Sequence, residues 1–163
     1  MKTLIVYYSL QGNTDYAAQR IAENIGADTL RLFSKKAYKD KGFAKFLSGG
    51  PSAIREETPD LEGYEVDLAE YDRVIFGFPV WASNIAPPLR TFIAEHQAEL
   101  TEKEVAAFAT QGGSGAPKAL AKLRDFIGID AFAAEGIFIE PKAQQSEETD
   151  AAIDAFSEEL QNS

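Results

Sequence analysis

Hydroxyl and amide side chains surround a glycine in the segment Ser9–Thr14, which directly follows an apolar run. Ser9, Asn13 and Thr14 can donate hydrogen bonds, and Gly12 lets the backbone approach a ligand closely. The helical pattern that follows would add free N–H groups and a partial positive charge at its first turn. This combination suits a phosphate held by neutral donors, because the segment contains no Lys or Arg. A capped strand-to-helix turn uses the same residue types, so the segment alone leaves both interpretations open.

Two further segments have compositions that are unusual for simple connections. Gly77–Ile85 holds the only Trp of the chain, Trp81, shortly after Pro79, and a Trp in a loop offers a flat surface to an aromatic ligand. Thr110–Gly115 has three glycines in four positions, which leaves its backbone open to a ligand lying against it. Each segment also has a purely structural interpretation, since the Trp could cover the core and the glycines could form an irregular connection.

Short apolar runs alternate with amphipathic stretches around these segments. We expect strands over Leu4–Tyr8, Thr29–Leu32, Arg73–Gly77, Glu104–Ala109 and Ala131–Ile139. We expect helices over Thr14–Ile25, Pro87–Glu99, Pro117–Ile127 and Thr149–Leu160, and a short one near Gly42–Leu47 that Gly49–Pro51 would end. The alternation predicts one α/β domain over residues 1–163, a doubly wound sandwich with a five-stranded parallel sheet in the order 2-1-3-4-5. In that order strands one, three and four are neighbours, so the three segments would converge at the carboxyl ends of the strands.

The composition excludes several kinds of site. The chain has no Cys, which rules out thiolate catalysis, disulfides and cysteine-ligated metals, and its single His96 rules out a multi-histidine site. We expect no metal and no catalytic side chain. Neither Gly-x-Gly-x-x-Gly nor Gly-x-x-x-x-Gly-Lys-Ser/Thr follows the first strand, which disfavours a dinucleotide fold and a P-loop NTPase. That strand ends in Tyr7 and Tyr8 rather than in clustered acids, unlike a response regulator.

Charge limits the partners that the chain is expected to bind. The net charge is −10, and residues 51–163 carry 22 acidic and eight basic side chains, so we expect no nucleic acid and no anionic membrane as partner. Five lysines between Lys35 and Lys45 form either a solvated surface or a docking patch for an anionic ligand. The apolar run Leu4–Tyr8 is too short for a signal peptide, which favours a cytoplasmic protein.

The three segments, in this order, resemble the flavodoxin-like family over essentially the whole chain. Ser9–Thr14 is similar to the family's phosphate loop for flavin mononucleotide (FMN), Ser/Thr-x-Thr-Gly-x-Thr, with Gln11 in place of the usual Thr. Pro79–Trp81 is similar to the loop flanking the isoalloxazine ring, and Thr110–Gly115 to the loop on its other side. The resemblance implies non-covalent FMN as cofactor. The binding residues that it implies are Ser9, Leu10, Gln11, Gly12, Asn13, Thr14, Pro79, Val80, Trp81, Ala82, Ser83, Thr110, Gln111, Gly112, Gly113 and Ser114.

Two departures from the family pattern bear on function. Residues 33–64 form a longer segment between strands two and three than in typical short flavodoxins, and the strand-four loop has glycines where the family often has a second aromatic residue. The glycines imply a more open flavin face, which would admit a second substrate. They extend the likeness to the broader flavodoxin-like group, which includes quinone reductases.

Three functions remain open at this stage. The first is electron transfer through FMN to a redox partner protein or a small-molecule acceptor, with the acidic surface lowering the flavin potential and favouring a basic partner. The second is an NAD(P)H-dependent FMN oxidoreductase acting on quinones or similar acceptors, since the loop at Gly112–Gly115 could admit a nicotinamide. The third is a flavin-free interaction module whose partner surface is residues 33–64. The sequence leaves the oligomeric state undetermined.

Overall fold

The structure, a computed structural model, describes residues 1–38 and 44–163, and of residues 44–48 it describes the backbone alone. The strands are β1 (Thr3–Tyr8), β2 (Asp28–Leu32), β3 (Arg73–Pro79), β4 (Glu104–Gln111) and β5 (Glu135–Ile139). The helices are α1 (Asn13–Ile25), α2 (Ala44–Ile54), α3 (Pro87–Leu100), α4 (Ala116–Ile127) and α5 (Glu147–Gln161), with a short 3-10 helix at Leu68–Glu70.

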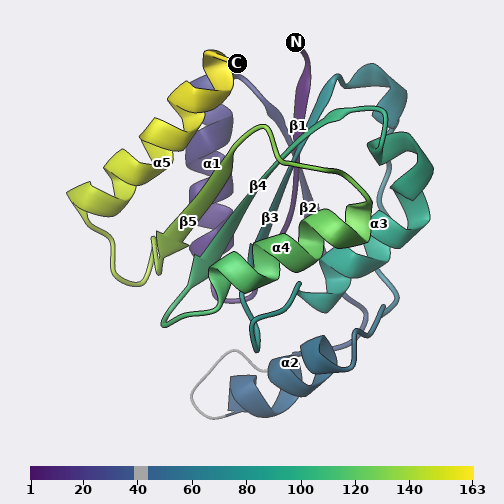
Figure 1. The fold of residues 1–163 in the computed structure, drawn as a ribbon. Helices are drawn as coiled ribbons and strands as arrows, with labels where there is room; N and C mark the ends of the chain where they lie inside the picture. The colour runs from purple at the N-terminus through teal and green to yellow at the C-terminus, as the bar shows by residue number, and fades with distance from the viewer. Residues whose placement is uncertain (39–43) are drawn as a thin grey trace.

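The strands form one parallel sheet in the order β2-β1-β3-β4-β5, which confirms the predicted fold class. Helices α1 and α5 cover one face of the sheet, and α3 and α4 cover the other (Figure 1). The register aligns Val6 of β1 with Leu30 of β2 and Phe76 of β3. All parallel strands therefore end at one edge of the sheet, and α2 lies beyond that edge (Figure 1).

Side chains of β1 alternate between two apolar clusters, one on each face of the sheet. Leu4 and Val6 pack toward α3 and α4, whereas Ile5 packs toward α1 and α5. Burial on both faces explains why the central strands read as continuous apolar runs. The edge strand β5 is buried on one face only, and Ile137 and Ile139 on its other face are exposed. Among the described helices, none combines the length and the apolar character needed to cross a membrane.

Two predicted boundaries are wrong. Gly49–Pro51 does not end the helix in the long segment, because α2 continues to Ile54 with Pro51 inside it. A methyl group on Gly49 would lie 2.9 Å from the Trp81 indole, so close packing of the glycine compensates for its low helix propensity. Residues 42 and 43 of the expected short helix lie outside the described part of the chain, as do Lys39 and Lys41 of the lysine cluster.

The last strand begins at Glu135 rather than at Ala131. Gly128 ends α4 in the left-handed conformation, and residues 129–132 then form the return to the sheet. Ala131 is exposed in that return, so the apolar composition that led to the prediction of a strand here does not reflect burial in the sheet.

Candidate functional site

The three predicted segments meet around one cavity of about 540 Å³ at the carboxyl edge of the sheet. The predicted residues that line it are Ser9, Leu10, Gln11, Asn13, Thr14, Pro79, Val80, Trp81, Ala82, Ser83, Thr110, Gln111, Gly112, Gly113 and Ser114. Gly12 lies in the same loop but is not part of the lining. Two lining residues, Gly50 of α2 and Glu140 after β5, were not predicted from the sequence. Neither belongs to a segment with a recognisable binding pattern, and only the tertiary fold brings them to the cavity.

The first loop presents free backbone donors at the start of α1. Gly12 has φ 94° and precedes the helix, a conformation that glycine adopts without strain. The backbone N–H groups of Gly12, Asn13 and Thr14 have no acceptor among the residues that the structure describes. Asp15 N–H, in contrast, donates to Ser9 Oγ at 3.1 Å. Unpaired amides at a helix start, together with the helix dipole, favour an anion such as phosphate.

The polar side chains of this loop also connect it to the rest of the site. The Thr14 hydroxyl bonds the buried Thr110 hydroxyl at the end of β4, with 2.8 Å between their oxygens. Asn13 Oδ1 accepts hydrogen bonds from the backbone N–H groups of Lys142 at 2.9 Å and Ala143 at 3.0 Å. The carboxamide oxygen of Asn13 is therefore already used by the turn between β5 and α5. The first loop is thereby joined to β4 and to that turn.

Charged groups on β2 and α1 form hydrogen bonds and an ion pair that hold the first loop in place. Arg31 donates to the carbonyl oxygen of Ser9 at 3.3 Å, and its guanidinium lies 3.6 Å from the Asp15 carboxylate. Tyr7 donates its phenolic proton to the same carboxylate. Burial, and then this hydrogen bond to Asp15, raise the pKa of Tyr7 to about 12. The phenol therefore stays protonated at neutral pH and keeps Asp15 oriented.

The second segment forms a tight turn from Trp81 to Asn84. Asn84 N–H donates to the Trp81 carbonyl at 3.0 Å, and the central residues Ala82 and Ser83 have φ values of 52° and 58°. A left-handed conformation costs a residue with a Cβ roughly 1–2 kcal/mol. Two such residues in succession at a cavity wall make this backbone a candidate for contact with a ligand.

An aromatic cluster forms the wall behind this turn. The Trp81 ring lies 5.7 Å from that of Tyr8 and 5.1 Å from that of Tyr38, measured between ring centroids. Gly49 of α2 packs against the same indole. Burial raises the pKa of Tyr8 far above its usual range, so its phenol remains neutral. Trp81 thus contacts the core and α2 while part of it lines the cavity.

The third segment is anchored at both of its ends. Gln111 Oε1 accepts a hydrogen bond from Ala116 N–H at 3.0 Å, which satisfies a donor at the start of α4. Gly115 has φ 101°, and a methyl group there would lie 2.5 Å from Ser83 Oγ. A methyl group on Gly112 would lie 3.1 Å from a carboxylate oxygen of Glu140, whereas one on Gly113 would meet nothing within 4 Å. Gly113 is therefore the open part of this rim, and Glu140 brings a negative charge to it.

In the described parts of the chain, no three His, Asp or Glu side chains gather as they would to hold a metal ion.

A family model described as Flavodoxin matches residues 2–150. This chain belongs to the flavodoxin family. The match confirms the resemblance that the three loops indicated, and it extends from the start of β1 into α5.

Solved structures share the fold of this flavodoxin-family protein. A flavoprotein from Lactobacillus acidophilus, solved in complex with FMN, is 22% identical with a TM-score of 0.71, and the match covers 96% of this chain and 98% of that one. Flavodoxin 2 from Bacillus cereus is 16% identical with a TM-score of 0.65, and the match covers 99% of each chain. A flavodoxin from the domain Archaea is 18% identical with a TM-score of 0.59, and the match covers 96% of this chain and 94% of that one.

Proposed function

We propose that this flavodoxin-family protein binds FMN non-covalently in the cavity and transfers electrons through it. The observation that carries the proposal is the meeting of all three loops around one cavity beyond β1, β3 and β4. Its volume of about 540 Å³ is in the range of small-molecule sites, roughly 300–1,000 Å³. The flavoprotein from Lactobacillus acidophilus, which has the same fold, was solved with FMN.

The residues present fit the two chemically different ends of such a ligand. The free N–H groups of Gly12, Asn13 and Thr14 would hold the phosphate, together with the Ser9 hydroxyl. The strained turn at residues 80–83 and the backbone at residues 111–113 would meet the polar edge of the ring system, with Trp81 beside it. Bound flavin supplies the redox chemistry, while the protein binds and orients it and sets its electrostatic environment. No side chain is proposed as a general acid or base.

The charge of the protein supports a carrier that docks on other molecules. The net charge is −10, and Glu140 adds a carboxylate to the cavity rim. Negative charge near the ring opposes the addition of electrons, which lowers the reduction potential and favours a donor role. A redox partner protein with a basic surface is the acceptor that fits best, and a small-molecule acceptor is the second possibility. We also propose that residues 1–163 fold as one domain. We further propose that the protein is cytoplasmic, and a chain without cysteine is compatible with a reducing compartment.

Electron transfer from the reconstituted protein tests this function. The protein is loaded with FMN, reduced by light and a sacrificial donor, and mixed with cytochrome c as a basic acceptor. We expect rapid reduction of the cytochrome, with a rate that falls as salt is added. In a parallel assay we expect NADPH oxidation with a quinone to remain near background. Sustained NADPH-dependent quinone reduction would instead assign a reductase, and failure of the reduced protein to pass electrons on would contradict a carrier role.

A further inference from the structure

A lysine from the far end of the chain lies against the first loop, which contains no cation of its own. A methyl group built on Gly12 would lie 3.0 Å from Nζ of Lys142 and 3.1 Å from its Cδ. The side chain of Lys142 therefore runs along Gly12, and its ammonium group lies beside the loop that offers the free N–H groups. The two residues are 130 positions apart in the sequence, so no local pattern connects them.

The backbone of Lys142 is fixed by the same loop. Asn13, the residue after Gly12, accepts hydrogen bonds through Oδ1 from the N–H groups of Lys142 and Ala143. The turn itself is closed by a hydrogen bond of 2.8 Å from Gln144 N–H to the Glu140 carbonyl oxygen. The backbone of Lys142 is thus held next to the loop, and its side chain starts from a fixed point beside Gly12.

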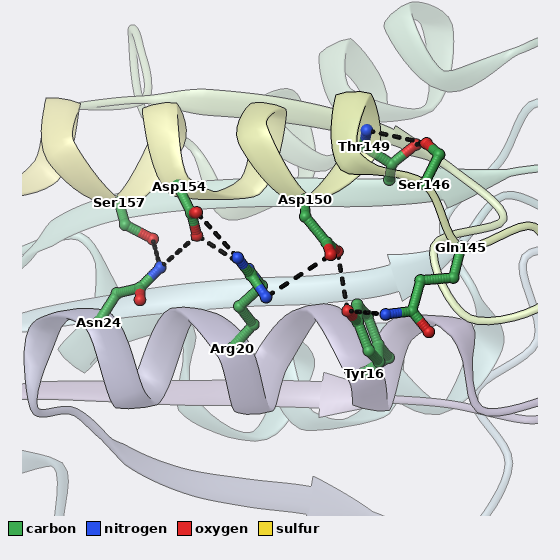
Figure 2. A network of polar contacts seen from close by, with 9 residues as sticks. All are labelled: Tyr16, Arg20, Asn24, Gln145, Ser146, Thr149, Asp150, Asp154 and Ser157. Carbon is green, nitrogen blue, oxygen red and sulfur yellow. Dashed lines mark hydrogen bonds and ion pairs between the residues drawn. The ribbon is translucent and has the colours of Figure 1, made fainter.

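Contacts between α1 and α5 hold this turn in place from its other side (Figure 2). The Tyr16 hydroxyl donates to Asp150 at 2.7 Å and accepts from Gln145 Nε2 at 3.0 Å. One turn further along α1, Arg20 forms two hydrogen bonds of 2.9 Å with the Asp154 carboxylate. The residues that flank Lys142 on the α5 side are therefore tied to the same helix whose first turn offers the free N–H groups.

The positive charge of Lys142 is not used in a contact with another described side chain. Its ammonium group has no hydrogen bond or ion pair with any residue in the described ranges 1–38 and 44–163. Arg31, another cation near the loop, is compensated by Asp15 at 3.6 Å and donates a hydrogen bond to the Ser9 carbonyl oxygen. Lys142 is thus an uncompensated positive charge beside unpaired N–H groups.

We propose that Lys142 binds the phosphate group of the flavin nucleotide and makes the site select FMN over riboflavin. This inference rests on the proposed function, since it concerns the phosphate of the same ligand. An ammonium group acts as a point charge toward phosphate, so its contribution depends on salt and on the charge of the phosphate. The phosphate of FMN would then be held by neutral donors of the loop and by one cation supplied from the turn between β5 and α5.

Flavin affinities of charge-matched variants test the proposal. K142Q removes the cation, K142R retains it, and K2Q makes the same change in net charge at the amino end of β1, far from the cavity. Dissociation constants for FMN and for riboflavin are measured by fluorescence at low and high salt. We expect K142Q to weaken FMN binding about tenfold, or ~1.4 kcal/mol, and to leave riboflavin binding within about twofold. K142R and K2Q should bind both flavins as the wild type does, and the salt dependence of FMN binding should be weaker in K142Q.

Failures of the inference and of the proposed function give different results. If wild type and K142Q bind FMN equally and with the same salt dependence, Lys142 does not bind the phosphate, although the FMN site stands. If K142Q loses FMN and riboflavin to the same extent, the residue maintains the cavity and does not select phosphate. If the wild-type protein binds neither flavin, both the inference and the proposed function are wrong. Lys142 is exposed, so these variants should fold normally, and thermal unfolding checks this directly.

Discussion

Replacing Gly12 with alanine adds a methyl group where the first loop contacts Lys142. Gly12 has φ 94° and ψ −6°, and an alanine in this region costs roughly 1–2 kcal/mol of folding free energy. The new methyl group would also lie 3.0 Å from Nζ of Lys142 and 3.1 Å from its Cδ. These are atoms of a flexible side chain, so the lysine would move aside rather than force the loop open. The substitution therefore combines backbone strain with displacement of the ammonium group.

Gly26 provides a matched control at the other end of the same helix. It has φ 69° and ψ 38°, and a methyl group on it would meet nothing within 4 Å. G26A thus introduces a similar backbone cost without touching a side chain or the cavity. Both variants should lower the free energy of unfolding by roughly 1–2 kcal/mol, and each kcal/mol corresponds to about 2–4 °C in Tm for a chain of this size. Urea unfolding, followed by the fluorescence of Trp81, measures the free energy of unfolding of both variants.

Binding should separate the two variants although their stabilities are similar. G12A should raise the Kd for FMN on the order of tenfold, because the cation beside the phosphate site is displaced, and should change the Kd for riboflavin much less. G26A should bind both flavins as the wild type does. In the double variant G12A/K142Q the loss of FMN affinity should not exceed that of G12A alone, since both changes remove the same contact. Equal FMN affinities for G12A and G26A would refute the contact between the Lys142 ammonium group and the phosphate.

Three further outcomes follow from buried or strained groups near the cavity. The pKa of Tyr7 is raised to about 12 in the folded protein, from about 10 in the unfolded chain. The protonated phenol therefore contributes fully to the free energy of unfolding below pH 10, and this contribution is lost as the pH rises to about 12. Between pH 10 and about 12 the free energy of unfolding should therefore fall by on the order of 2–3 kcal/mol more in the wild type than in Y7F. Urea titrations at each pH measure this difference. A82G should raise the unfolding free energy by about 0.5–1 kcal/mol, because glycine relieves the left-handed strain at φ 52°, and differential scanning calorimetry measures the rise in Tm. T14V or T110V alone should cost about 1–3 kcal/mol in urea unfolding, since each leaves one buried hydroxyl unpaired, whereas the double variant should cost less than either.

Each of these outcomes can be contradicted by a specific result. Identical pH dependence in Y7F and the wild type would show that the phenol is not held protonated by the fold. A lower Tm for A82G would mean that the alanine methyl group makes contacts that outweigh the strain. Additive losses in the T14V/T110V pair would show that the two hydroxyl groups are not each other's partners.

Most of the sheet could be predicted because burial acts locally on the composition of its strands. A strand covered by helices on both faces needs apolar side chains at nearly every position, as in Leu4–Tyr8, and this pattern is visible without any knowledge of the fold. Glycine and proline then mark the boundaries, as Gly26 does for α1 and Pro87 for α3. Parallel strands joined by helices leave few possible topologies, so the strand order and the meeting of the three loops follow from the same pattern.

The parts that could not be predicted depend on contacts between distant segments. Gly49 lies inside α2 and packs against Trp81, whereas its local propensity predicts a break. Glu140 and Lys142 stand in a turn with no distinctive composition, and only the return of β5 to the sheet brings Glu140 to the cavity and Lys142 to the first loop. The side-chain oxygen of Asn13 accepts the N–H groups of Lys142 and Ala143, a role that its place in the first loop does not reveal. Side-chain roles of this kind depend on partners that are about 130 residues away.

A titration of the flavin-free protein with FMN, followed by flavin fluorescence, tests the central claim most directly. Burial of the ring against Trp81 and the neighbouring turn should quench the fluorescence, with saturation at one flavin per chain. Riboflavin, titrated in the same way, should bind more weakly because it has no phosphate for the loop at Ser9–Thr14. Unchanged FMN fluorescence at micromolar protein concentrations would contradict the account and would leave the cavity without the ligand that its three loops predict.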